Sequence, residues 1–127
     1  MENNYFHLPG FEEVVLEESY VRRVVTWPTQ LVIYLDLVLR PDHKDYFKPP
    51  PDEWQCYVDA KLEFCNVRSI GWKNINIQPT SDQDGIDIGQ VHVLHYKSST
   101  YYLFADFGEG VIESDVPQIT VLRDQQV

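Results

Sequence analysis

The chain is short of cysteine, of basic residues and of long hydrophobic runs. Two cysteines among 127 residues are too few for the disulfide framework of a small secreted domain. No window approaches the ~20 apolar residues of a membrane span. Residues 1–10 lack the basic and apolar regions of a signal peptide. We therefore expect a cytoplasmic protein without a membrane segment.

Basic residues are half as frequent as acidic ones, at 10 against 20, which gives a formal net charge of -10. Because affinity for DNA and RNA comes largely from Lys and Arg, nucleic-acid binding is disfavoured, and so is an anionic membrane surface. From Asn74 onward, eight acids face only Lys97 and Arg123. This excess is either a solvated face that keeps the domain soluble or a patch that docks a basic protein partner.

Apolar residues occupy every second position in two segments, 31–39 and 54–64. They are Leu31, Ile33, Leu35, Leu37 and Leu39 in the first, and Trp54, Cys56, Val58, Ala60, Leu62 and Phe64 in the second. A period of two predicts extended strands with one face in a core. On such a strand Cys56 and Cys65 point to opposite faces, so they cannot form a disulfide.

Further strands are predicted at 12–17, 20–27, 86–96, 100–107, 111–114 and 118–123. Five valines between residues 11 and 25 favour strands over a helix there, since β-branched residues lose rotamer freedom in a helix. Residues 41–53 form a proline-rich loop, 97–99 a hairpin loop and 108–110 a turn. No repeat or linker divides the chain. The prediction is one domain, residues 1–127, folded as an antiparallel all-β sandwich or flattened barrel of about eight strands.

Few motifs suggest metal or cofactor chemistry, and each has a structural explanation. Asp82, Asp84 and Asp87 flank Gly85 as in a calcium loop, but the remaining EF-hand ligands are missing, which favours a turn. His92 and His95 would share a metal on a helix, whereas on the predicted strand they face opposite ways. We assign no metal ligand, no cofactor and no catalytic residue.

Acid–base chemistry has three candidates, Asp36, His43 and Asp106. His43 lies in the proline-rich loop without a nucleophile nearby in sequence, and Asp106 lies at a strand end before a turn. Asp36 interrupts an otherwise apolar strand and is expected either to face solvent or to pair with Arg22, Arg23 or Lys61.

Two groups of residues are candidates for binding. Tyr46, Phe47, Trp54 and Tyr57 gather around the proline-rich loop, and aromatic side chains near proline and acids are typical of protein and sugar interfaces. The alternative is that these rings cover the end of the core. The acidic candidates for a basic partner are Glu109, Glu113 and Asp115.

Several short motifs span most of the chain: Leu8-Pro9-Gly10-Phe11, Leu16-Glu17-x-Ser19-Tyr20-Val21, Val38-Leu39-x-Pro41-x-His43-x-x-Tyr46, Pro51-x-Glu53-x-x-Cys56-Tyr57 and Phe107-Gly108-Glu109. With them the chain resembles small uncharacterised bacterial proteins. The resemblance implies a compact all-β domain, and some small acidic domains of this general kind are immunity proteins that protect a cell from a toxin.

Three functions remain open from the sequence. The favoured one is a non-catalytic protein, immunity- or adaptor-like, that binds a macromolecular partner. The alternatives are a barrel that binds a small molecule or sugar between its sheets, and an enzyme that uses a carboxylate/His pair.

Overall fold

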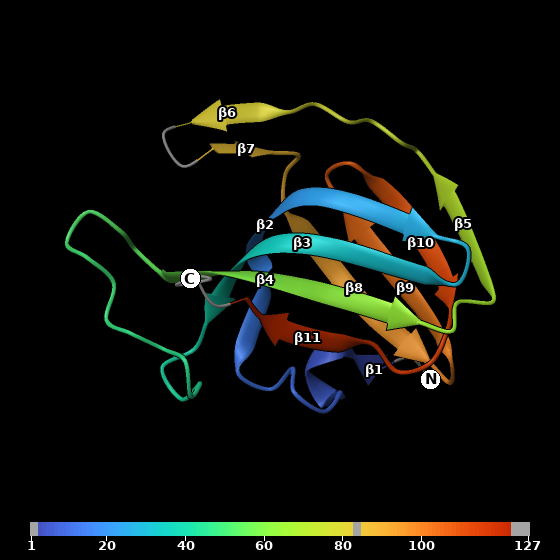
Figure 1. Cartoon of the computed structure of the whole chain (residues 1–127), viewed down its shortest axis with the longest axis horizontal. Helices are drawn as coiled ribbons and strands as arrows, with labels where there is room; N and C mark the ends of the chain where they lie inside the picture. Colours follow the sequence, from blue (N-terminus) through green and yellow to red (C-terminus); the bar gives the residue numbers. More distant parts are fainter. Residues whose placement is uncertain (1–2, 83–84, 123–127) are drawn as a thin grey trace, which may run out of the picture.

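The computed structural model describes residues 3–82 and 85–122, which form two antiparallel sheets packed on a shared core (Figure 1). The first sheet has the strand order β1 (Asn3–Asn4), β8 (Val91–Lys97), β9 (Thr100–Ala105), β10 (Gly108–Glu113) and β5 (Ser69–Lys73). The second has the order β11 (Gln118–Val121), β4 (Cys56–Cys65), β3 (Gln30–Leu39) and β2 (Val14–Trp27). A separate hairpin joins β6 (Thr80–Asp82) to β7 (Gly85–Asp87), and η1 (Tyr5–His7) is a single 3₁₀ turn. The expected all-β sandwich is confirmed.

The described residues contain eleven strands against about eight expected. The difference comes from short elements, since β1 has two residues and β6 and β7 have three each. Elements of this length carry too little alternation to be recognised in a sequence.

The core lies between the sheets and is built from the alternating positions. All five odd-numbered leucine and isoleucine positions of β3 are buried, as are Cys56, Ala60, Leu62 and Phe64 of β4. The ring of Phe64 meets that of Tyr101 from β9 edge-on, with the ring centroids 5.7 Å apart. Cys56 is buried and Cys65 is half-buried. Both are free thiols, in agreement with the prediction that they point to opposite faces of the strand and form no disulfide.

The prediction that Trp54 belongs to the buried face of this strand is wrong. Strand β4 begins at Cys56, and the Trp54 side chain is 96% exposed in the loop before it. A turn closed by the Glu53 N–H on the Pro50 carbonyl, 2.9 Å, keeps the chain irregular up to that point.

The expectation of two strands at 12–17 and 20–27 is wrong, because β2 runs without a break from Val14 to Trp27. Its pairing with β3 shifts instead, from Val15 opposite Val38 to Tyr20 opposite Asp36. The Ser19 hydroxyl spans this irregularity: it donates to the Val15 carbonyl (2.7 Å) and accepts the Val38 N–H (2.9 Å). A side chain therefore replaces the ladder bonds that the irregularity removes.

Strand β2 is also hydrogen-bonded to the other side of the sandwich. The Val21 N–H donates to the Gly89 carbonyl (2.7 Å), and the Ile88 N–H donates to the Val21 carbonyl (2.9 Å). Residues 88 and 89 pair with β2 through these bonds and belong to neither neighbouring strand. The strand expected at 86–96 is therefore split into β7 and β8. These two bonds join β2 to the segment between β7 and β8.

The final meander differs from expectation at one turn. The hairpin expected at 97–99 is confirmed, and Lys97 is the last residue of β8, opposite Thr100. Residues 108–110 are not a turn but the first residues of β10, and the chain reverses just before them, so that Gly108 pairs with Ala105.

Replacing Ser19 by alanine should destabilise the protein by about 1–3 kcal/mol, because the buried Val38 N–H loses its acceptor. The matched control is Ser69→Ala, since Ser69 is exposed on β5 and should change stability by less than about 0.5 kcal/mol. Chemical denaturation of both variants measures the difference. Equal losses would show that the Ser19 bridge contributes nothing particular.

Candidate functional site

A polar pocket of about 380 Å³ lies on the outer face of the four-stranded sheet. Its lining residues come from β2, β3, β4, β7 and the proline-rich loop: Tyr20, Arg22, Asp36, Glu53, Tyr57, Asp59 and Asp87. In Figure 1 the β6–β7 hairpin and the loop between β3 and β4 both project at the same end of this sheet. The hairpin supplies Asp87 and the loop supplies Glu53.

Strand alternation and register bring the central residues of the pocket together. Asp36 lies between the core residues Leu35 and Leu37, so it must point outward. Register places Asp59 of β4 and Tyr20 of β2 directly opposite it, on either side. The pocket is therefore a consequence of strand pairing and not of any local motif.

Asp36 forms an ion pair with Arg22, one of the three partners that the sequence suggested. Arg22 Nη1 also donates to the Ile86 carbonyl, at 3.1 Å. The other two cations lie elsewhere: the Arg23 guanidinium stacks 4.2 Å above the Tyr34 ring, and Lys61 Nζ lies 3.5 Å from Glu63. The Arg22 guanidinium thus ties β2 both to β3 and to the β6–β7 hairpin.

The pocket holds an excess of negative charge. Among the described residues, four carboxylates and one guanidinium line it, which leaves a formal surplus of three negative charges. Asp36 and Asp59 are cross-strand neighbours, an arrangement that costs stability for like charges. Asp87 is buried, and its Oδ1 accepts the Gly89 N–H at 2.9 Å. A cleft lined by charge of one sign attracts ions of the opposite sign, so this site favours a cationic group.

Two tyrosines form the aromatic part of the pocket, with the rings of Tyr20 and Tyr57 6.2 Å apart. Burial raises the pKa of the Tyr57 hydroxyl above its ordinary value, and Tyr20 and the Glu53 carboxylate raise it further. The Tyr57 hydroxyl is therefore protonated at neutral pH.

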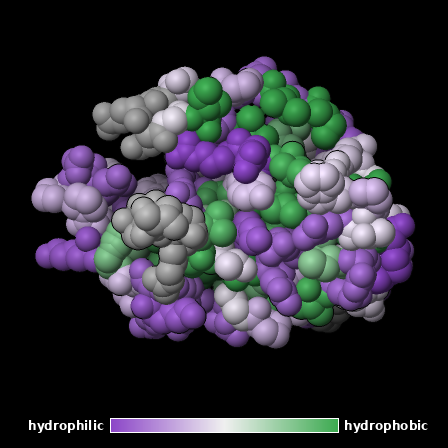
Figure 2. All heavy atoms as spheres, in the orientation of Figure 1, coloured by the Kyte–Doolittle hydropathy of each residue, from purple (hydrophilic) through white to green (hydrophobic). Residues whose placement is uncertain are grey.

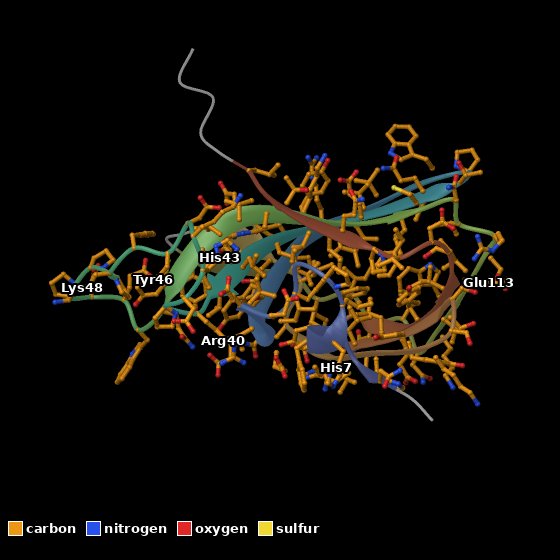
Figure 3. All side chains as sticks on the ribbon, turned by 90° about the horizontal axis from the view of Figure 1, so that it is seen from below. His7, Arg40, His43, Tyr46, Lys48 and Glu113 are labelled. Carbon is orange, nitrogen blue, oxygen red and sulfur yellow. The ribbon has the colours of Figure 1, made fainter. Side chains whose placement is uncertain are left out.

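The predicted aromatic group is divided by the fold. Tyr57 lines the pocket, and Trp54 follows the pocket residue Glu53 in the chain. Tyr46 packs against the core, and Phe47 is 45% exposed, with its N–H donating to Cys56 Sγ at 3.4 Å. Figure 3 shows Tyr46 and Lys48 on the loop that projects from one end of the sandwich.

The predicted acidic residues lie on β10 and in the segment that follows it. Glu109 and Glu113 are the second and last residues of β10, and in Figure 3 Glu113 lies at the opposite end of the molecule from Tyr46. Glu109 Oε2 accepts a hydrogen bond from Asn74 at 2.6 Å, and its other oxygen lies 3.9 Å from Lys73 Nζ. Asp115 is bound by Asn66 (2.7 Å) and Arg68 (3.3 Å), whose hydrogen bonds lower its pKa.

The three acid–base candidates lie in three separate places. Asp36 is held by Arg22 in the pocket, and His43 Nδ1 accepts the Asp45 N–H at 3.0 Å within the proline-rich loop. Asp106 pairs with His92, at 2.5 Å between Oδ1 and Nε2. The Gln90 N–H on Asp106 Oδ2, together with His92, lowers the pKa of that carboxyl. Asp106 thereby connects the turn between β9 and β10 to Gln90 and His92.

The two motifs considered for metal binding lie in the β6–β7 hairpin and in β8. Asp84 lies outside the described residues, and within the described ranges no cluster of three or more Asp, Glu, His or Cys side chains is arranged for a metal. An irregularity between Val91 and Val93 changes the alternation of β8, so Leu94 is buried while His92 and Val93 are both exposed. His95 stacks between Tyr102 and Phe104, with centroids 5.2 and 5.9 Å away.

Comparison with known proteins yields no relative: the chain matches no family model, no curated protein and no solved structure. In the part of the chain that the structure describes, none of the helical structure is long and apolar enough to cross a membrane.

The sequence alone points to Tyr57 as a binding residue and to Asp36 as an acid–base candidate. It does not predict that Tyr20, Glu53, Asp59 and Asp87 belong to one site with them. The outward side of the segment 54–64 already contained Tyr57 and Asp59. What was missing was the register that sets Asp59 beside Asp36, because pairing between strands is not encoded by either strand alone.

The variant Glu53→Gln should lower the pKa of Tyr57 towards its ordinary value, because it removes a negative charge that opposes ionisation of the hydroxyl. Titration of ¹³C-labelled tyrosine by NMR measures this shift, with Tyr57→Phe assigning the signal. Glu113→Gln, at the far end of the molecule, is the control and should leave the Tyr57 signal unchanged. An unaltered pKa in Glu53→Gln would place Glu53 away from the ring.

Proposed function

We propose that this protein is a non-catalytic binding protein that engages a basic macromolecular partner through the polar pocket, in an immunity- or adaptor-like role. The observation that carries the proposal is the surplus of three negative charges among the described residues of the polar pocket. A lysine or arginine side chain of a partner has the charge and the reach that such a site requires.

The geometry of the pocket favours a protein side chain over a free ion. Its carboxylates come from several elements and lie beside two tyrosine rings, which attract cations through their faces. Trp54, next to Glu53, is almost fully exposed. Tyrosine, tryptophan and arginine are the residues that contribute most binding energy in protein interfaces. The surroundings of the pocket therefore resemble an interface centre.

The pocket is a better candidate than the acidic group of Glu109, Glu113 and Asp115. Glu109 is already engaged by Asn74 and Lys73, and Asp115 by Asn66 and Arg68. Among the described residues of the pocket there are four carboxylates and one guanidinium, and that guanidinium pairs with Asp36. A basic partner gains more binding free energy where fewer of the negative charges are already paired with cations or hydrogen-bond donors.

A nine-residue arginine peptide is a suitable probe for this site. Glu53→Gln/Asp59→Asn should weaken its binding about tenfold, which corresponds to ~1.4 kcal/mol, because both exposed carboxylates belong to the pocket. Fluorescence anisotropy with a labelled peptide measures the affinity at about 50 mM and about 500 mM salt, where screening removes most of the attraction.

The matched control is Glu109→Gln/Glu113→Gln, which changes the net charge by the same amount on β10. We expect this variant to bind within about twofold of the wild type. Equal weakening in both variants would mean that the peptide senses only the net charge of -10, and the proposal would fall. A natural partner recovered from cells must show the same dependence on the two variants.

A further inference from the structure

A second concavity of about 400 Å³ lies between β2 and the connection from β5 to β6, and its lining is mainly apolar. Its walls are Trp72, Phe107 and Ile88 on one side of the sandwich, Val24 of β2, and Ile75 and Ile77 of the β5–β6 connection. Figure 2 shows hydrophobic atoms gathered along the upper part of this face, where Figure 1 places that connection. We call this concavity the apolar groove.

The walls of the apolar groove are fixed by two glycines of β10. A Cβ on Gly110 would lie 2.6 Å from Trp72 Cζ3, and a Cβ on Gly108 would lie 2.6 Å from Ile75 Cδ1. The absence of both side chains lets the indole and the isoleucine lie against the strand. The Asn76 N–H also donates to the Phe107 carbonyl at 2.9 Å, which holds the connection in place. The groove is thus preformed, as small-molecule sites usually are.

The groove leaves apolar surface in water. Ile75 is 51% exposed and Ile77 is 57% exposed, although both lie beside the half-buried Trp72. A volume of this size falls in the range of small-ligand pockets, about 300–1,000 Å³. A bound apolar molecule would remove this surface from water, which is favourable in proportion to the area covered.

The charge at the groove indicates the polar end of the ligand. In a chain with twice as many acidic as basic residues, none of the described carboxylates lines the groove, whereas Arg22 and Arg23 do. Arg22 is engaged by Asp36 and the Ile86 carbonyl. Arg23 lies over the Tyr34 ring and, among the described residues, forms no ion pair, so its guanidinium is the cation available to an incoming anion.

From this combination we propose that the apolar groove binds a small amphipathic organic anion, with a hydrocarbon or aromatic body against Trp72, Ile75 and Ile77 and an acidic head group at Arg23. A guanidinium forms charge-assisted hydrogen bonds with carboxylate, sulfonate or phosphate oxygens. This site is independent of the partner proposed for the polar pocket, since its lining residues are different apart from Arg22.

Two probes test the proposal on the full chain. Anilinonaphthalene sulfonate has an aromatic body and an anionic group, and its fluorescence rises in an apolar site. Decanoate, a saturated carboxylate, should displace it. In the background Trp27→Phe/Trp54→Phe, which changes two exposed residues, Trp72 is the only tryptophan and reports directly on occupancy of the groove.

Two variants separate the apolar body from the head group. Ile77→Ser should weaken binding of both probes at least about fivefold through lost apolar contact. Arg23→Gln should weaken decanoate about fivefold or more while leaving decanol, its uncharged counterpart, within about twofold. Ile86→Ser is the matched control, because Ile86 is 58% exposed and does not line the groove. Circular dichroism and thermal midpoints establish that all variants are folded.

The proposal predicts saturable binding, a shift in Trp72 emission, loss in Ile77→Ser and no change in Ile86→Ser. Absence of saturable probe binding to the folded wild type would overturn it, and so would equal binding by the Ile77 and Ile86 variants. If Arg23→Gln weakens decanoate and decanol alike, the anionic head group assigned to the ligand is wrong.

Discussion

Strand β2 is hydrogen-bonded to both halves of the sandwich, and the rest of the architecture depends on this double pairing. It forms the edge of the four-stranded sheet beside β3, and through Val21 it bonds to Ile88 and Gly89 of the other side. The register between β2 and β3 shifts along β2, and the Ser19 hydroxyl satisfies the backbone between Val15 and Tyr20, where it does. Tyr20, Arg22 and Arg23, which line the two surface sites, lie within four residues of that shift.

The parts of the fold that could be predicted are those governed by a single strand. The alternation of β3 and β4 identifies the core, the separation of the two thiols and the outward position of Asp36. The parts that could not be predicted depend on several strands at once. The unbroken course of β2 depends on a side-chain bridge from Ser19 to Val38, and the polar pocket depends on the register between Asp36 and Asp59. Tertiary pairing decides these features, and local sequence does not record it.

The two concavities divide the chemistry of the molecule between neighbouring surfaces. Of the residues that the structure describes, four carboxylates line the pocket over β2, β3 and β4, whereas the groove near β5 is lined mainly by apolar side chains and by none of the acids. Within that part of the chain Arg22 is common to both sites, and it is held by Asp36 and by the Ile86 carbonyl. A single ion pair therefore marks the boundary between a surface suited to cations and one suited to apolar anions.

The glycines of β10 have a consequence for how this sequence can diverge. Trp72 occupies the space that a Cβ at position 110 would need, and Ile75 occupies the space that a Cβ at position 108 would need. A larger residue at 110 is therefore tolerated only together with a smaller or displaced side chain at 72, so these two positions are expected to covary in homologous chains. Gly108 has a φ of +152°, which disfavours any side chain there whatever stands at 75, so position 108 is expected to stay glycine. The shape of the groove would then be inherited as one coupled pair of residues and one fixed glycine.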